Sequence, residues 1–150
     1  MILINVPQDG NCLFRCLYIY LNRIQRTYER FKNGKIRKRT INKKESDDSN
    51  ELRQDIIDYV ENNKDKYDSI MYNDNEDYET IEERIELMRM PTEYGGIIEL
   101  DAAAYLNNIC IEVYVECETR FNKIATINER ARKICRMLLE TDHYNLILKM

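Results

Sequence analysis

The spacing of apolar positions changes along the chain. In the first two thirds, apolar residues recur mostly at intervals of three and four, which is typical of helices with one buried face. After Asn107-Asn108 they alternate with polar residues: Ile109, Ile111, Val113 and Val115 would share one face of a strand. Helices first and strands last favour an α+β domain with a mainly antiparallel sheet.

The helical part predicts four helices. The first is apolar on nearly every side, so we expect it to be buried at the centre of the fold. Ser49 or Asn50 is expected to cap the second, and Pro91 to end the third. The expected ranges are 12–24, 51–62, 78–89 and 97–107.

Short apolar runs predict strands near both ends of the chain. Residues 7–11 between the first strand and the first helix have the composition of a turn, and the polar residues 32–50 are expected to form an exposed loop. The expected strands are 2–6, 109–116, 121–127, 134–139 and 143–148.

Length and composition indicate one soluble globular domain over residues 1–150. No apolar run is long enough for a membrane-spanning helix, and the opening segment lacks the features of a signal peptide. The net charge of −4 argues against general nucleic-acid binding. Charges segregate into a basic stretch, 23–44, and an acidic run, 74–86. Both are interpreted as solvated surface, and the alternative for the acidic run is a docking face for a cationic partner.

Five cysteines without a C-x-x-C spacing make a disulfide framework or a structural zinc site a poor interpretation. We therefore expect no metal and no cofactor. The same number and spacing of cysteines favour a reducing intracellular compartment, the cytoplasm or the nucleus.

Cys12 stands where a helix start can activate a thiol. It follows the turn Asp9-Gly10-Asn11, and unpaired amides with the helix dipole stabilise an anion there, so its pKa is expected to fall. Amides of Gly10, Asn11 and Cys12 could also bind the oxyanion of a transition state. Asp9 can hold the loop through main-chain bonds. The alternative is a buried structural cysteine, as expected for Cys16.

His143 is the only histidine, and so the only ordinary acid/base partner for such a thiolate. Asn145 lies two residues further along an expected strand and would face the same side. It could accept a hydrogen bond from one ring nitrogen and direct the other at Cys12, a Cys-His-Asn arrangement. The adjacent Asp142 would point to the opposite face.

Three blocks give the chain a resemblance to the OTU (ovarian tumour) family of cysteine proteases. They are Asp9-Gly10-Asn11-Cys12-Leu13-Phe14-Arg15, Tyr94-Gly95-Gly96 with Glu99-Leu100, and His143-Tyr144-Asn145. The resemblance implies a papain-like α+β fold in which a buried helix carries the nucleophile at its N-terminus. It also implies the site: Cys12 as nucleophile, His143 as general base and acid, Asn145 as the orienting residue, and Asp9 supporting an oxyanion loop that includes Gly10 and Asn11.

Two positions depart from the family's pattern. Tyr94 stands where the family usually has tryptophan, and with Gly95 and Gly96 it is expected to line the substrate channel. Asn145 stands where aspartate is frequent, and an amide orients the imidazole without adding charge.

The function implied by the resemblance is deubiquitination: a monomeric thiol protease would cleave isopeptide bonds at the C-terminus of ubiquitin or polyubiquitin through a thioester. The alternatives are a ubiquitin-binding module that does not cleave, and a protease for another ubiquitin-like modifier. Neither nucleic acid nor membrane is expected as a partner.

Overall fold

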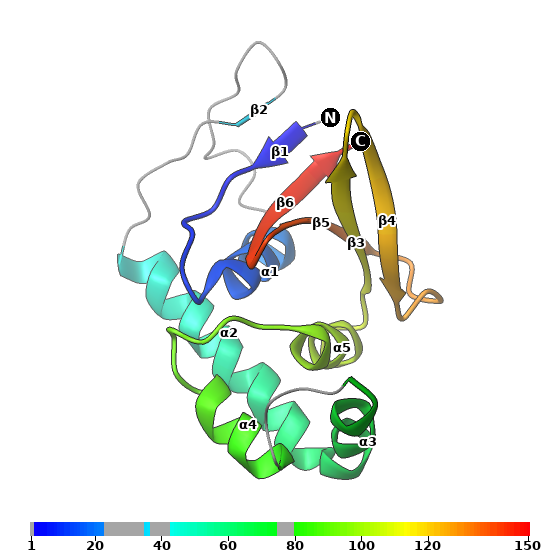
Figure 1. Ribbon diagram of the computed structural model, residues 1–150. Helices are drawn as coiled ribbons and strands as arrows, with labels where there is room; N and C mark the ends of the chain where they lie inside the picture. The colour runs from blue at the N-terminus through cyan, green and yellow to red at the C-terminus, as the bar shows by residue number, and fades with distance from the viewer. Residues whose placement is uncertain (1, 23–34, 37–42, 75–79) are drawn as a thin grey trace.

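The computed structural model describes residues 2–22, 35–36, 43–74 and 80–150 (Figure 1). Within these ranges the chain is α+β, as predicted. The helices are α1 (Cys12–Asn22), α2 (Lys43–Asn62), α3 (Lys64–Asp74), α4 (Ile81–Met88) and α5 (Ile97–Leu106). The strands are β1 (Ile2–Ile4), β2 (Lys35–Ile36), β3 (Cys110–Cys117), β4 (Arg120–Ile127), β5 (Ile134–Glu140) and β6 (His143–Lys149).

The strands form one sheet in the order β2-β1-β6-β5-β3-β4. The pairs β1·β6, β5·β6 and β3·β4 are antiparallel, whereas β1·β2 and β3·β5 are parallel. The sheet is therefore mainly antiparallel, as expected. Strands from the two ends of the chain lie side by side, with Ile2 opposite Lys149, so the termini meet at one end of the molecule (Figure 1).

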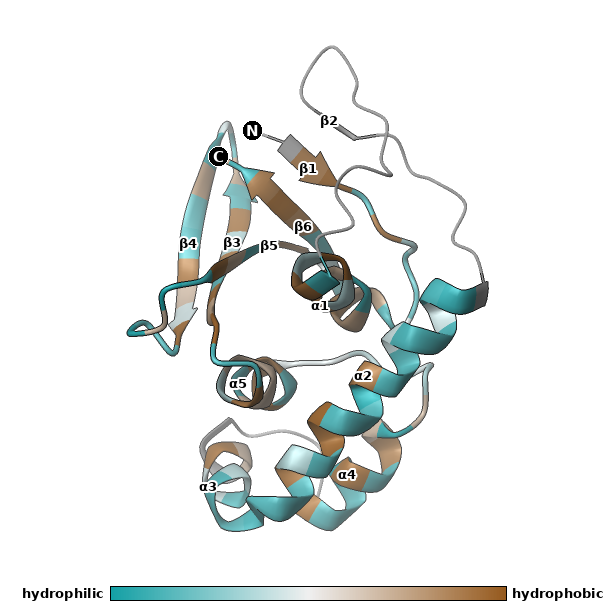
Figure 2. Cartoon of the chain, turned by 180° about the vertical axis from the view of Figure 1, so that it is seen from behind, coloured by the Kyte–Doolittle hydropathy of each residue, from teal (hydrophilic) through white to brown (hydrophobic). Residues whose placement is uncertain are grey.

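Helix α1 lies between the sheet and α2, as Figures 1 and 2 show from opposite sides. Leu13, Phe14 and Leu17 on it are fully buried, and the helix packs against both α2 and β6. Because apolar residues cover nearly every side of the helix, it has no polar face to expose to water. Its position confirms the expected central helix.

Helix α2 begins at Lys43 instead of after Asn50, so the predicted loop 32–50 is wrong for residues 43–50. It is also wrong for Lys35–Ile36, which form β2 beside β1, a strand too short to show alternation in the sequence. Residues 32–34 and 37–42 of that loop, and 23–34 and 37–42 of the basic stretch, lie outside the described residues. Ser49, which is fully buried, and Asn50 both lie within the helix, so neither is its cap. Contacts to α1 stabilise these added turns: Ser46 Oγ accepts from Arg15 Nη1 at 3.2 Å, and Asp48 Oδ2 accepts from Tyr18 Oη at 2.9 Å. The pattern of apolar positions in the sequence does not predict tertiary polar contacts of this kind.

Helix α3 was not predicted, because only a few of its positions are apolar. Tyr67 anchors it: the ring is fully buried and the hydroxyl donates to Asp101 Oδ1 at 2.9 Å on α5. Helix α4 begins with Thr80 as its N-cap, whose hydroxyl accepts from the Glu83 amide at 3.1 Å. The expected start of this helix, residues 78–79, lies outside the described residues.

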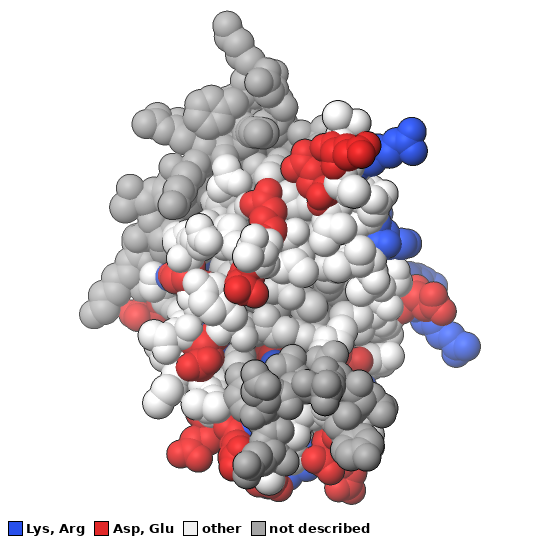
Figure 3. All heavy atoms as spheres, viewed as in Figure 1, with Lys and Arg blue, Asp and Glu red and all other residues white. Residues whose placement is uncertain are grey.

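Acidic side chains gather at the lower end of the molecule, where α3 and α4 lie (Figure 3). Of the predicted acidic run, Glu82, Glu83 and Glu86 are exposed on α4, and residues 75–79 lie outside the described residues. No helix in the part of the chain that the structure describes is long and apolar enough to cross a membrane.

Candidate active site

The first residue of α1 meets the first residues of β6. Cys12 Sγ accepts a hydrogen bond from the Tyr144 amide at 3.4 Å and lies 3.9 Å from the carbonyl oxygen of Asp142, to which the thiol donates. The sulfur therefore rests against the backbone on both sides of His143. The fold thus brings together the two residues, near opposite ends of the chain, that sequence analysis selected as nucleophile and base.

His143 and Asn145 form the expected side-chain pair along β6. His143 Nε2 and Asn145 Oδ1 are 3.1 Å apart, and both side chains are buried. Asn145 Oδ1 also accepts from the Val6 amide at 3.0 Å, while Nδ2 donates to Glu140 Oε2 at 3.3 Å. Since Oδ1 can only accept, this contact is a hydrogen bond when the neutral imidazole carries its proton on Nε2.

This tautomer leaves His143 Nδ1 as the basic nitrogen. Nδ1 is one of three buried side-chain nitrogen or oxygen atoms among the described residues that have no hydrogen-bond partner, so it makes no hydrogen bond to the Cys12 thiol in this conformation. It is the ring nitrogen nearer to the backbone, against which the Cys12 sulfur lies. A buried lone pair without a donor costs free energy, and the Cys12 thiol, whose sulfur rests on the backbone on both sides of His143, is a donor that this lone pair lacks.

The prediction of a lowered Cys12 pKa is wrong for this structure. Cys12 is 1% exposed. Burial raises the pKa of its thiol above the ordinary value, and the hydrogen bonds from the Tyr144 and Leu13 amides only partly offset this. The helix start was recognised in the sequence, but the extent of burial follows from packing that it does not display. A thiolate here needs proton transfer to an adjacent base.

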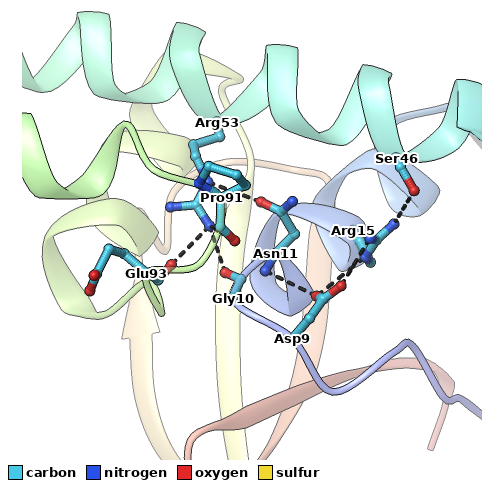
Figure 4. Close-up of polar contacts among 8 residues, drawn as sticks. All are labelled: Asp9, Gly10, Asn11, Arg15, Ser46, Arg53, Pro91 and Glu93. Carbon is cyan, nitrogen blue, oxygen red and sulfur yellow. Dashed lines mark hydrogen bonds and ion pairs between the residues drawn. The ribbon is translucent and has the colours of Figure 1, made fainter.

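The turn before Cys12 is held by Asp9 (Figure 4). Asp9 Oδ1 accepts from the Asn11 amide at 3.0 Å, and Oδ2 accepts from Arg15 Nη2 at 2.9 Å. Asp9 thus supports the loop, and its side-chain partners do not include His143.

Two of the loop amides are occupied in this conformation. The Cys12 amide donates to the Asp9 carbonyl oxygen at 3.2 Å, and the Asn11 amide is bound to the Asp9 carboxylate. The expected convergence of the Gly10, Asn11 and Cys12 amides on one oxyanion position is therefore not seen here for Asn11 and Cys12.

Gly10 is required for close approach of another segment rather than for an unusual φ. A Cβ at this position would lie 2.3 Å from the backbone carbon of Thr92 and 2.4 Å from the Pro91 oxygen. Any side chain would push the turn at residues 91–92 away from the nucleophile loop.

Sequence analysis missed Arg53, a fully buried residue of α2 that binds the same loop (Figure 4). Its guanidinium lies 4.2 Å from the Phe14 ring centre. Burial lowers the pKa of Arg53 to about 10, so it stays charged at neutral pH. Its N–H groups donate to Asn11 Oδ1 (3.0 Å) and to the carbonyl oxygens of Gly10 (2.6 Å), Glu93 (2.8 Å), Met88 (2.9 Å) and Pro91 (3.4 Å).

The predicted channel segment packs on the nucleophile helix. A Cβ at Gly95 would lie 3.1 Å from the Leu13 side chain, so the segment passes close to the first turn of α1. Gly96 donates its amide to Glu99 Oε1 at 2.8 Å, and Glu99 forms a buried ion pair with Arg84. Tyr94 is 44% exposed, free to meet a partner beside this segment.

Among the described residues, no group of three or more His, Cys, Asp or Glu side chains is placed to hold a metal ion.

A family model described as OTU, OTU-like cysteine protease, matches residues 7–135. This match includes Cys12 and ends before His143, so the placement of His143 rests on the geometry above. A search of curated proteins found no match.

Solved structures of similar fold carry the same family name. The OTU domain of OTUD1 superposes with a TM-score of 0.68 at 16% identity, covering 98% of this chain and 85% of that one. The viral OTU domain protease from Qalyub virus gives 0.62 at 15% identity, covering 96% and 83%. An OTU deubiquitinase from Wolbachia pipientis wMel, bound to ubiquitin, gives 0.63 at 12% identity, covering 97% and 94%. At these identities the likeness shows the fold.

Proposed function

We propose, since the chain belongs to the family of OTU-like cysteine proteases, that it is a deubiquitinase that cleaves the isopeptide bond after the C-terminal glycine of ubiquitin. One observation carries the proposal: Cys12 Sγ lies against the backbone on both sides of His143, whose ring is held by Asn145. Two solved structures of similar fold are complexes with ubiquitin, which supports ubiquitin as the partner.

The reaction follows from the position of each group. Cys12 Sγ attacks the carbonyl carbon while its proton passes to His143 Nδ1, forming a tetrahedral oxyanion. Collapse breaks the C–N bond, and the imidazolium gives its proton to the departing lysine amine. Water, deprotonated by His143, then hydrolyses the thioester and releases the ubiquitin carboxylate and the free thiol.

The oxyanion needs donors that the free enzyme uses internally. In the proposed mechanism the Cys12 amide exchanges its bond to the Asp9 carbonyl oxygen for one to the oxyanion. Asp9 and Arg53 hold the rest of the loop meanwhile, through the Asn11 amide and the Gly10 carbonyl oxygen respectively.

Replacement of the nucleophile tests the proposal. Cys12→Ala should retain the fold and ubiquitin binding but lose at least about 10³-fold in kcat/KM for a ubiquitin C-terminal amide substrate. The matched control is Cys117→Ala, because Cys117 is exposed on β3 and should leave kcat/KM unchanged. Full cleavage by Cys12→Ala would disprove the assignment.

A ubiquitin probe with a C-terminal electrophile separates the alternatives. A deubiquitinase forms a covalent adduct at Cys12, identified by peptide mass spectrometry, whereas a module that only binds ubiquitin forms none. Faster labelling by a probe built on another ubiquitin-like modifier would identify a protease for that modifier instead. A panel of diubiquitins then defines the linkage preference of an active enzyme.

A further inference from the structure

The candidate site contains an acidic side chain that neither the sequence pattern nor the proposed mechanism uses. Glu140 is the last residue of β5 and pairs directly with His143 across the β5–β6 hairpin. Its Oε2 accepts a hydrogen bond from Asn145 Nδ2 at 3.3 Å. The carboxylate is thus joined to the imidazole through the Asn145 amide.

The Asn145 amide could present either of its two ends to His143, and its neighbours decide which. The backbone N–H of Val6 can only donate, so the end of the Asn145 amide that it contacts must be Oδ1. An ionised Glu140 can only accept, so the end of the Asn145 amide that it contacts must be Nδ2. With both neighbours in place Oδ1 faces His143 Nε2, and the ring proton is held on that nitrogen.

We propose that Glu140 is a positioning residue of this site, acting through Asn145. By accepting from Nδ2 it keeps Oδ1 directed at His143, and so keeps Nδ1 unprotonated and ready to receive the Cys12 proton. The consequence for turnover rests on the proposed protease function, whereas the effect on the imidazole tautomer does not.

The variants separate an accepted hydrogen bond from other roles of Glu140. Glu140→Ala removes the acceptor and should lower kcat/KM about 5- to 10-fold. Glu140→Lys places a donor against Nδ2 and should lower it further. Glu140→Gln still offers an oxygen and should stay within about 3-fold of the wild type. Glu116→Ala is the matched control, an exposed strand glutamate on β3 whose loss should change nothing.

Glu140 is exposed at a strand end, so these variants should keep the wild-type melting temperature. Wild-type kcat/KM in the Ala and Lys variants would overturn the proposal. So would a Gln variant as impaired as Ala, because charge and not the accepted hydrogen bond would then matter.

The single histidine gives a readout that does not depend on substrate. ¹⁵N NMR of the neutral imidazole should show the Nε2–H tautomer in the wild type and in Glu140→Gln, with a growing share of Nδ1–H in Glu140→Lys. Unchanged tautomers in Glu140→Lys would contradict the proposal. If wild-type protein shows the expected tautomer yet cleaves no ubiquitin, the proposed function fails and the positioning role stands.

A double variant checks that Glu140 acts through Asn145. In an Asn145→Ala background, Glu140→Ala should cause no further loss, because the shared hydrogen bond is already gone. Asn145→Asp places two carboxylates side by side, so adding Glu140→Gln should recover the activity that Asn145→Asp loses through their repulsion. Additive losses, or a double variant less active than Asn145→Asp alone, would refute the proposal.

Discussion

At the scale of single residues, the reactivity of Cys12 depends on His143. Burial raises the pKa of the Cys12 thiol, so without a base little thiolate exists at neutral pH. We predict that His143→Ala slows iodoacetamide alkylation of Cys12 at pH 7 by about 10-fold or more. Because a raised pKa favours the thiol up to higher pH, the lost rate should return only as pH rises above the range of ordinary thiols.

The exposed Cys117 is the internal reference for that measurement, read by peptide mass spectrometry. Cys12 should react faster than Cys117 in the wild type and more slowly in His143→Ala. Equal Cys12 rates in the two proteins at pH 7 would mean that His143 does not create the thiolate.

Residues with local signals could be predicted from the sequence, and residues recruited by tertiary contacts could not. A cysteine after a glycine turn identified Cys12, and strand periodicity paired His143 with Asn145. Glu140 and Arg53 reach the site only through the register of a hairpin and the packing of α2. Likewise, the expected oxyanion amides depend on loop torsions, which in this structure direct the Cys12 amide to Asp9 instead.

At the scale of elements, one guanidinium joins α2 to the nucleophile loop and to the turn after α4. We predict that Arg53→Lys lowers the free energy of unfolding by about 2–4 kcal/mol, measured by urea denaturation. An ammonium cannot reach the four carbonyl oxygens and the Asn11 side chain that Arg53 binds. A loosened loop should also reduce kcat/KM in the fraction that remains folded.

Arg89→Lys is the matched control, because Arg89 binds Asp58 and Glu61 at the surface between α4 and α2. Such exposed ion pairs contribute about 1 kcal/mol or less. Similar losses for Arg53→Lys and Arg89→Lys would show that the buried network contributes no more than a surface pair.

Elements with an apolar period were predicted closely, and those that depend on polar contacts were not. Helix α1 and strands β3 to β6 start and end within a few residues of expectation. The first turns of α2 and all of α3 depend on pairs such as Tyr18 with Asp48 and Tyr67 with Asp101. The parallel pairing of β3 with β5 is a matter of strand order, which alternation alone does not encode.

At the scale of the whole molecule, the candidate site exists only when both ends of the chain are folded together. Val6 after β1 binds Asn145 on β6, and Cys12 on α1 rests on the start of the same strand. Elements from opposite ends therefore form one packed unit around the chemistry, and assembly of the site should coincide with folding of the domain.

Leu146 tests this coupling, because it is a fully buried aliphatic residue on β6, next to Asn145. Leu146→Ala should cost about 2–4 kcal/mol and move the urea midpoints of circular dichroism and of ubiquitin cleavage down together, with the slope m unchanged. Ile124→Ala on β4, where the side chain is 55% exposed, should move neither. Cleavage lost well before circular dichroism would instead show that α1 and β6 separate while the rest of the domain stays folded.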